Sequence, residues 1–370
     1  MTLHQLSTAS GLLILGLSGL PALAQVDPIS TTAGLKAACE GNAGNLVVIT
    51  SGVTVNTGYP AGAPEQVRSG CRIQLTGGAS MQFDKVGLAF AGPLAIIADS
   101  KSSLQLQEAS LAAPQVLVQF THMDSGVKME QSRIDATAGH LDLQIGIGNK
   151  IEVSGARTAG VPLSRAAFAA TGHVRISASR LHSAVYKDTG MVAGGTVSVT
   201  ASGADTSIVF DNSGAHAYNG DVRFDLTSSR SKLEASNAAF TAVAGHVALS
   251  MRGAEGGLKL SGTAVQAGAS AQVISTGPKT EVLVDGGSIT ARGSILLEGY
   301  TAGFDGVLLV SNLQISGGSD VRMLTGLRGK TMVFDNRINA AGLVQSATRT
   351  WGVCEANNNQ VTAPLVQLCL

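Results

Sequence analysis

The chain has 370 residues, a formal net charge of +0 and 46 glycines, and only 14% of its residues are charged. Because Lys and Arg are not in excess, the basic footprint of a nucleic-acid-binding protein is missing, and we expect no nucleic-acid partner. The 44% hydrophobic content argues against a disordered chain, and the 4% aromatic content predicts a core of small and branched side chains.

Residues 1–24 have the pattern of a secretory signal peptide. An apolar run at 11–17 is followed by Ala22-Leu23-Ala24, an A-x-A cleavage motif ahead of Gln25. A membrane anchor is the alternative, but the run is too short to cross about 30 Å of hydrocarbon. We therefore expect an exported bacterial protein that is periplasmic, secreted or at the cell surface, with no transmembrane anchor after cleavage.

Residues 25–70 are expected to form an N-terminal cap and a first coil. Residues 32–39 suit a short helix, and apolar residues at 46–49 and 53–55 suit the first strands.

A repeat then occupies residues 71–338. Its motif is an apolar residue, a small polar residue, an Asn or Gly, two free positions and another apolar residue. The steps between successive Asn/Gly positions are 23–26 residues, except for one step of 34 residues between Ala178 and Asn212. A period in this range indicates a solenoid. The aligned positions are Lys85, Glu108, Gln131, Gly155, Ala178, Asn212, Asn237, Gly262, Gly286, Asn312 and Asn336.

Each repeat contains strands in which apolar and polar residues alternate, the pattern of a strand with one buried face. No segment after residue 45 has a helical period. We therefore predict an all-β, single-stranded parallel β-helix of about eleven coils with a short N-terminal capping helix. An antiparallel sandwich or barrel is the alternative, but its strand spacing would be less regular. The Asn/Gly position is interpreted as a corner that needs φ > 0, which Gly and Asn tolerate best.

The 24-residue repeat, the Asn/Gly corner and the lead-in at 32–55 resemble the right-handed parallel β-helix superfamily to which pectate lyases belong. The resemblance covers residues 33 to about 338 and implies the fold and its hand. It is a resemblance of architecture, and this architecture carries many functions. Several lyase and hydrolase signatures are missing, among them W-x-D-H and R-x-P-x-x-R.

Residues 339–370 are expected to form a C-terminal cap, which leaves two of the four cysteines at each end of the solenoid. Eleven coils at about 4.8 Å separate the ends by roughly 50 Å, whereas bridged Cα atoms lie within about 7 Å. The expected disulfides are therefore Cys39–Cys71 and Cys354–Cys369. A metal site is the alternative for these cysteines, but their spacings fit no C-x-x-C pair, and we expect no metal and no cofactor.

The irregular step of 34 residues suggests a loop excursion at 182–193, and it gives the first candidate binding site. A sugar-binding or catalytic edge could form there, although a solvated loop is the simpler interpretation. The candidate ligand-binding residues are His182, Tyr186, Lys187, Asp188, His216 and Tyr218.

Asp99, His122 and Asp124 are weak catalytic candidates, because stacking of adjacent coils could pair the two carboxylates for acid–base chemistry. Outward charges on the strands, such as Arg175, Lys128 and Glu152, have mixed signs and suit a solubilising face. The Gly-His pairs at 139–140, 172–173 and 245–246 recur at strand starts and are interpreted as scaffold.

The favoured function is that of an exported non-enzymatic β-helix, a surface, matrix or adhesin-like protein with a polysaccharide or cell-surface component as partner. The alternative is a carbohydrate-active enzyme, either a polysaccharide lyase or a hydrolase. A groove with converging carboxylates would favour the enzyme.

Overall fold

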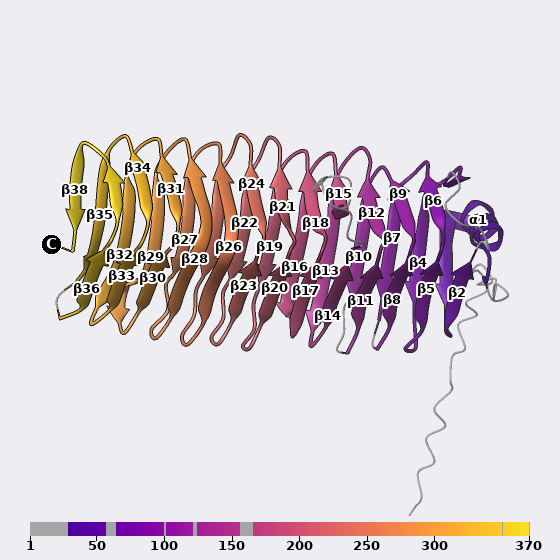
Figure 1. The fold of residues 1–370 in the computed structure, drawn as a ribbon. Helices are drawn as coiled ribbons and strands as arrows, with labels where there is room; N and C mark the ends of the chain where they lie inside the picture. Colours follow the sequence, from indigo (N-terminus) through magenta and orange to yellow (C-terminus); the bar gives the residue numbers. More distant parts are fainter. Residues whose placement is uncertain are drawn as a thin grey trace, which may run out of the picture.

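The computed structural model describes residues 29–56, 64–99, 101–120, 124–155, 166–349 and 351–369. Residues 1–24, which are expected to be a signal peptide, lie outside these residues. The described chain forms an all-β parallel solenoid of right-handed type with about 12 turns, close to the eleven coils expected. Figure 1 shows an elongated stack with the single α-helix at one end and the C-terminal strand β38 at the other.

One strand of each coil belongs to a 14-stranded parallel sheet. Its strands are, in spatial order, β1 (Leu46–Ile49), β4 (Cys71–Leu75), β7 (Leu94–Ala98), β10 (Val116–Phe120), β13 (Leu141–Ile147), β16 (Val174–Arg180), β19 (Val197–Ala201), β22 (Val222–Leu226), β25 (Val247–Met251), β27 (Ala271–Ser275), β29 (Ile295–Phe304), β32 (Val321–Leu327), β35 (Leu343–Thr348) and β38 (Leu365–Leu368).

The other two strands of each coil form a 24-stranded sheet, because the long strands β26 and β28 run through both positions. The second strand of successive coils is β2 (Val53–Asn56), β5 (Ser80–Asp84), β8 (Ser103–Gln107), β11 (Gly126–Glu130), β14 (Lys150–Ser154), β17 (Ser183–Lys187), β20 (Ser207–Asp211), β23 (Lys232–Ser236), β26 (Gly257–Ala267), β28 (Glu281–Ala291), β30 (Val307–Ser311), β33 (Lys330–Phe334) and β36 (Val353–Asn357). The third is β3 (Glu65–Val67), β6 (Gly87–Phe90), β9 (Ser110–Ala113), β12 (Arg133–Ala136), β15 (Ala166–Ala170), β18 (Gly190–Ala193), β21 (Gly214–Ala217), β24 (Ala239–Ala242), the later parts of β26 and β28, β31 (Gln314–Gly317), β34 (Arg337–Ala340) and β37 (Gln360–Thr362).

The helix α1 (Thr32–Gly41) packs against the first coil and is followed by a short 3-10 turn, η1 (Ala43–Asn45). The side chain of Thr31 caps it by accepting the N–H of Gly34 at 3.0 Å. Leu35 is fully buried, and removing such a side chain from water contributes about 1.5–3 kcal/mol. Cys39 forms the expected disulfide with Cys71 of β4, which ties the helix to the stack.

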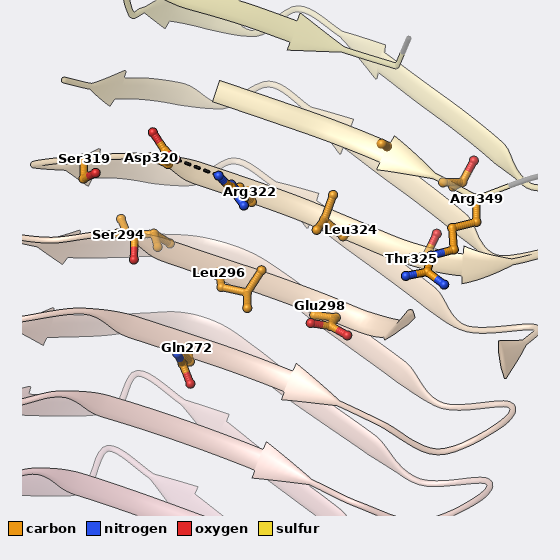
Figure 2. Close-up of a pocket in the computed structure, with 13 residues that line it drawn as sticks. Gln272, Ser294, Leu296, Glu298, Ser319, Asp320, Arg322, Leu324, Thr325 and Arg349 are labelled. Carbon is orange, nitrogen blue, oxygen red and sulfur yellow. Dashed lines mark hydrogen bonds and ion pairs between the residues drawn. The ribbon is translucent and has the colours of Figure 1, made fainter. Parts of the chain in front are cut away.

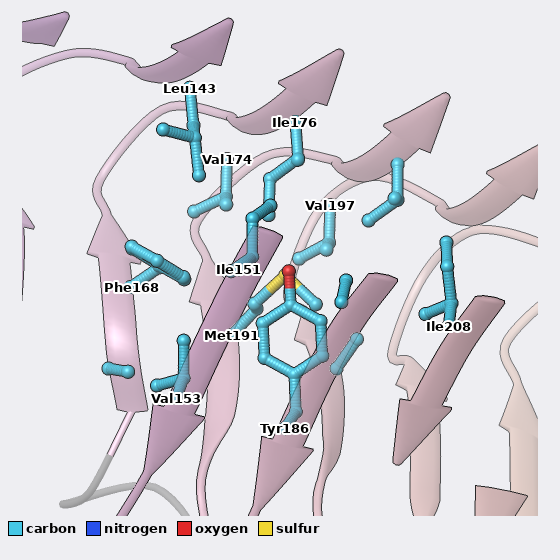
Figure 3. Close-up of a cluster of buried hydrophobic side chains, with 14 of the residues drawn as sticks. Leu143, Ile151, Val153, Phe168, Val174, Ile176, Tyr186, Met191, Val197 and Ile208 are labelled. Atoms are coloured by element: carbon cyan, nitrogen blue, oxygen red, sulfur yellow. The ribbon is translucent and has the colours of Figure 1, made fainter. Parts of the chain in front are cut away.

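Alternation along each strand separates the core from the outer surface. In β13, Leu141, Leu143 and Ile145 point inward, whereas Asp142 and Gln144 point outward. The parallel register then stacks equivalent side chains of successive coils, so that Leu143 lies between Val118 and Ile176 of the adjacent coils. Figure 3 shows this stacking of branched side chains around Tyr186 and Met191.

The corner interpretation of the Asn/Gly ladder is confirmed. The corner residues adopt φ between 49° and 67°, and those that are not Gly bear the strain of a left-handed conformation. They are Lys85, Glu108, Gln131, Asp188, Asn212, Asn237, Gly262, Gly286, Asn312, Asp335 and Asn358. Gly155 occupies the equivalent place, since its N–H donates to the residue before the next corner, Lys187, as that of Gln131 donates to Ser154.

Two positions in the expected ladder were wrong. Ala178 lies inside β16 with its side chain in the core, and the corner of that coil is Asp188. Asn336 follows the true corner Asp335; it is buried, and its side chain bonds the backbone of Val310.

Because the corner was misplaced, the step of 34 residues was assigned to the wrong part of the chain. The segment 182–193 is regular, because it forms β17, the corner and β18. The additional residues fall at 156–165, between β14 and β15, and lie outside the described residues.

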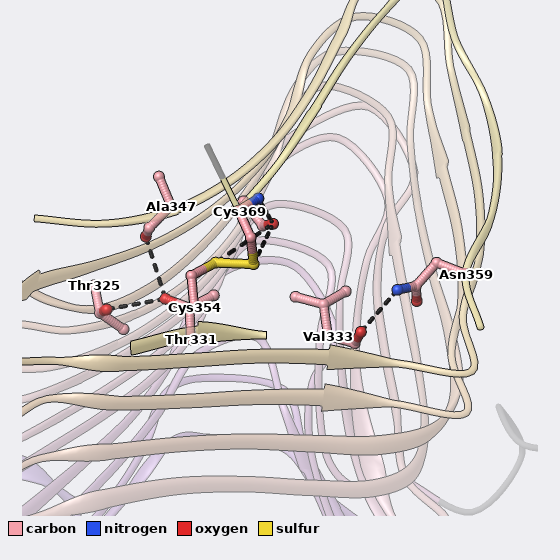
Figure 4. Close-up of a disulfide and its surroundings, with 8 residues drawn as sticks. Thr325, Thr331, Val333, Ala347, Cys354, Asn359 and Cys369 are labelled. Atoms are coloured by element: carbon pink, nitrogen blue, oxygen red, sulfur yellow. Dashed lines mark hydrogen bonds between the residues drawn. A yellow bond between two sulfur atoms is a disulfide. The ribbon is translucent and has the colours of Figure 1, made fainter. Parts of the chain in front are cut away.

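The C-terminal segment at 339–370 contains β35 to β38 and part of β34. β36, β37 and β38 pair in parallel with β33, β34 and β35, so the described part of this segment extends the stack. The expected disulfide Cys354–Cys369 joins β36 to the end of β38 (Figure 4).

Candidate functional site

The outer face of the 14-stranded sheet carries a shallow groove of about 420 Å³ near its middle, here called the central groove. The groove exists because short side chains and Gly146 lie beside longer ones on adjacent coils. In register, Gln144 stands between Gln119 and Ser177, at a spacing of about 4.8 Å. The outward lining is mostly uncharged and able to form hydrogen bonds: Gln119, Gln144, Ser177, Ser179, Thr200, Ser202, Asp225 and Thr227.

The single carboxylate of the central groove is already engaged. Nε of Arg252 donates to Oδ1 of Asp225 at 3.1 Å, and the second guanidinium nitrogen bonds the other oxygen. The hydroxyls of Thr200, Ser202 and Thr227 donate to backbone carbonyls of the preceding coil. The groups left to meet a ligand are the side chains of Gln119, Gln144, Ser177 and Ser179.

A second groove of about 530 Å³, the C-terminal groove, lies on the same face between β27 and β35. Figure 2 shows Leu296 and Leu324 in its floor, with the bonded pair Asp320 and Arg322 to one side and Glu298 and Arg349 to the other.

Asp320 of the C-terminal groove is held as a carboxylate. The N–H of Leu343 donates to its Oδ1 at 2.9 Å, and Arg322 donates to its Oδ2 at 2.9 Å. These contacts, the backbone N–H first, lower the pKa of Asp320 despite opposing desolvation. A carboxyl with a lowered pKa is a poor general acid at neutral pH.

A ladder of side chains edges the middle of this face, one residue before each strand from β13 to β25. Each side chain accepts the backbone N–H of the equivalent residue in the next coil. His140 Nδ1 accepts from His173 at 3.0 Å, and His173 Nδ1 accepts from Thr196 at 2.8 Å. Thr196, Asp221 and His246 continue the series to Ser270. The Gly-His pairs therefore do serve the scaffold, as expected.

The weak catalytic candidates are not gathered into a dyad. The pairing of Ser103 with Gly126 places Asp124 level with Lys101, two residues beyond Asp99. Oδ1 of Asp99 is buried with no hydrogen-bond partner among the described residues, and His122 lies outside them. Asp124 instead lines a hollow of about 350 Å³ over β8, β11 and β14.

Among the six binding candidates, the rings of His216 and Tyr218 are in contact. Their ring centroids are 4.5 Å apart on the outer face around β21, and Tyr218 is 43% exposed. Burial lowers the pKa of His216, whose Nε2 has no partner within the described chain. His182 and Lys187 are exposed before and at the end of β17, and Asp188 is the corner, bonded by Asn212 at 2.6 Å.

Tyr186 belongs to the core. Its side chain is fully buried, and its ring stacks on Phe210 with centroids 4.8 Å apart. The alternation in β17 directs Ala184 and Tyr186 inward, so Tyr186 cannot meet an external ligand.

Among the described strands, no register pair places two carboxylates side by side, and Lys128 instead faces Glu152. In the same residues, no group of three or more His, Cys, Asp and Glu side chains is arranged to hold a metal ion. Nothing in the described part of the chain is a helix long and apolar enough to cross a membrane.

Sequence reasoning missed the outward residues of the central groove, Gln144 and Ser177 among them. The signal was present in the alternation of β13 and β16, where buried apolar residues alternate with outward residues that are mostly polar. It could be used only with the correct register between coils, which the misplaced corner at Ala178 obscured.

No protein-family model, curated protein or solved structure matches the chain.

Proposed function

We propose that this chain is an exported, non-enzymatic β-solenoid that binds a hydroxyl-rich polysaccharide along the outer face of its 14-stranded sheet, at a cell surface or in a matrix. The observation that carries the proposal is the central groove, which is shallow and lined in part by hydroxyl and carboxamide groups. Such groups both donate to and accept from sugar hydroxyls. The two disulfides support export, because disulfides persist in oxidising compartments.

A polysaccharide lyase or hydrolase is the second candidate, and the C-terminal groove is the observation that favours it. Glu298, Asp320, Arg322 and Arg349 share that groove. Glycoside hydrolysis needs two carboxyl groups in different protonation states. The lowered pKa of Asp320, which follows from its bonds to Leu343 and Arg322, weighs against that role.

The test is incubation of the purified protein with a panel of polymers: dextran, a soluble neutral β-glucan, chitosan and polygalacturonate. Binding is measured by interferometry, and products are measured as unsaturated ends and reducing sugar. Ser177→Arg fills the central groove and should lower affinity at least tenfold. Ser236→Arg, an exposed serine of β23 on the other sheet, is the matched control and should bind as the unmodified protein.

Binding without product supports the proposal. Release of product, or equal binding by the two variants, contradicts it.

A further inference from the structure

The stacked rings of His140 and His173 are the feature of the ladder that the scaffold does not require. Their centroids are 4.7 Å apart with an interplanar angle of 20°. Other coils fill the same position with Thr196 or Asp221, and these accept the same backbone N–H at 3.3 and 2.7 Å. The backbone bond therefore needs an acceptor at this position but no imidazole.

The ladder fixes the tautomer of both rings. Because Nδ1 of His140 and of His173 accepts a backbone N–H, the proton of each neutral imidazole is on Nε2. Neither Nε2 has a hydrogen-bond partner in the described chain, and both residues are partly exposed. The two stacked rings thus present two parallel N–H donors. A metal ion at Nε2 would require loss of that proton and of the ladder bond.

These donors lie on the same face as the central groove, at the start of two of its strands. His140 and His173 lie two residues before the first outward positions of β13 and β16, which are Asp142 and Arg175, and Gln144 and Ser177 of the groove lie two residues further on. Four residues of extended chain span about 13 Å. Two adjacent coils therefore carry one continuous polar strip from the histidines into the groove.

The charges of the strip balance. Nη1 of Arg175 lies 3.8 Å from Oδ1 of Asp142, and their side chains are 50% and 35% exposed. The strip therefore offers imidazole and guanidinium donors together with a carboxylate acceptor, and it has no net charge. This set of groups matches the hydroxyls of an uncharged sugar better than a carboxylate or sulfate group.

We propose that His140, His173, Asp142 and Arg175 form a subsite that extends the central groove and binds one uncharged sugar residue of the polymer. The imidazole N–H groups and Arg175 donate to hydroxyl oxygens, and Asp142 accepts a hydroxyl proton. The subsite rests on the proposed polysaccharide binding and gives it a ligand class, a neutral glycan.

The test uses the double variant His140→Thr with His173→Thr. Threonine already serves in the ladder at position 196, so the thermal midpoint should match that of the control His246→Thr. Affinity for dextran or the neutral β-glucan, whichever the unmodified protein binds, should fall about tenfold or more, because two hydrogen bonds are lost. His246 lies three coils beyond His173, before the apolar Ala248, and its variant should bind normally.

A second variant, Asp142→Asn with Arg175→Gln, leaves the ladder unchanged and should also lower affinity for the neutral polymer. The ring ¹⁵N resonances of His140 and His173 should shift on titration with that polymer, which a purely structural role would not produce. Full affinity in both variants overturns the subsite even though the proposed function stands. Preference of the unmodified protein for polygalacturonate also overturns it, and binding to no polymer overturns both proposals.

Discussion

The two grooves on the outer face of the 14-stranded sheet share one backbone geometry and differ in how far their polar side chains are bonded within the protein. In the central groove Asp225 is bonded to Arg252, and the hydroxyls of three residues donate to backbone carbonyls, whereas Gln119, Gln144 and Ser177 face solvent without such bonds. In the C-terminal groove the carboxylate of Asp320 accepts hydrogen bonds from Leu343 and Arg322, so both of its oxygens are already bonded within the protein. A groove is a candidate binding site when its polar groups remain available, and this criterion, unlike volume, favours the central groove.

The largest expected effect is a local loss of stability near the C-terminal groove that leaves the central groove unchanged. The C-terminal groove depends on the final coils, where the hydroxyl of Thr331 donates to the carbonyl of Ala347 (Figure 4). In the same coils the backbone N–H of Cys369 donates to the carbonyl of Ser346. Replacing Cys354 and Cys369 by Ser should destabilise these coils by about 3 kcal/mol, the chain-entropy value for a loop of about 15 residues. Hydrogen exchange should accelerate in β35, β36 and β38.

Exchange in β13 and β16 is the internal control for this disulfide variant. Coils of a solenoid contact only their neighbours, so the central groove should keep its protection. Equal acceleration in the central coils would contradict local unfolding.

The second effect separates the grooves by binding. Leu324→Arg places a long cation in the C-terminal groove, as Ser177→Arg does in the central groove. Affinity for the neutral polymer should fall at least tenfold in Ser177→Arg, because the new side chain occupies the space of the ligand. In Leu324→Arg the affinity should stay within about twofold of that of the unmodified protein. The opposite order would move the site to the C-terminal groove and would favour the enzymatic alternative.

The third effect concerns the core beneath the central coils. The hydroxyl of Tyr186 is buried with no partner among the described residues, and burial raises its pKa well above the usual range. Tyr186→Phe removes an uncompensated polar atom and should stabilise the protein by about 1 kcal/mol in denaturant unfolding. Tyr218→Phe, at a 43% exposed tyrosine, is the control and should change stability by less than about 0.5 kcal/mol. A loss of stability in Tyr186→Phe would show that the hydroxyl has a partner.

The fold was predictable because its constraints are local and repeated. A corner with φ > 0 recurs in most of the described coils, and the two pairs of cysteines lie too far apart along the stack for any pairing but Cys39–Cys71 and Cys354–Cys369. The position of the extra residues was not predictable from the motif. The sequence Ser177-Ala178-Ser179 fits the repeat motif although it lies inside β16. The true corner, Asp188, shares with the corners Lys85 and Glu108 a positive φ but not the residue type.

The candidate site was harder to predict because it depends on register across coils. His140 and His173 are 33 residues apart, and only the pairing of Leu141 with Val174 makes them neighbours. The candidates drawn from sequence were selected as residue types that cluster along the chain. That choice placed Tyr186 in a binding site although the alternation of β17 buries it.

The smallest expected effect is a dependence of stability on pH that belongs to the coils of the central groove. Burial, then the charges of Arg175 and His140, lower the pKa of His173, while Asp142 opposes the shift. Its folded pKa is therefore below the ordinary value of about 6.5, and the unfolded chain binds the proton first. Its contribution to stability is complete above that value and is lost as pH falls through the folded pKa.

The thermal midpoint should accordingly drop between about pH 7 and pH 5. The drop should be smaller in His140→Thr with His173→Thr, because threonine keeps the ladder bond without titrating. Protonation of Nδ1 of His173 would place two N–H groups face to face, so the acid effect should appear first as faster exchange of the amide of Thr196. If the loss of stability in acid is unchanged in the double variant, it belongs to carboxylates such as Asp221. Desolvation raises the pKa of Asp221, but the bonds from His246 and Arg223 outweigh it, so that this pKa is also lowered.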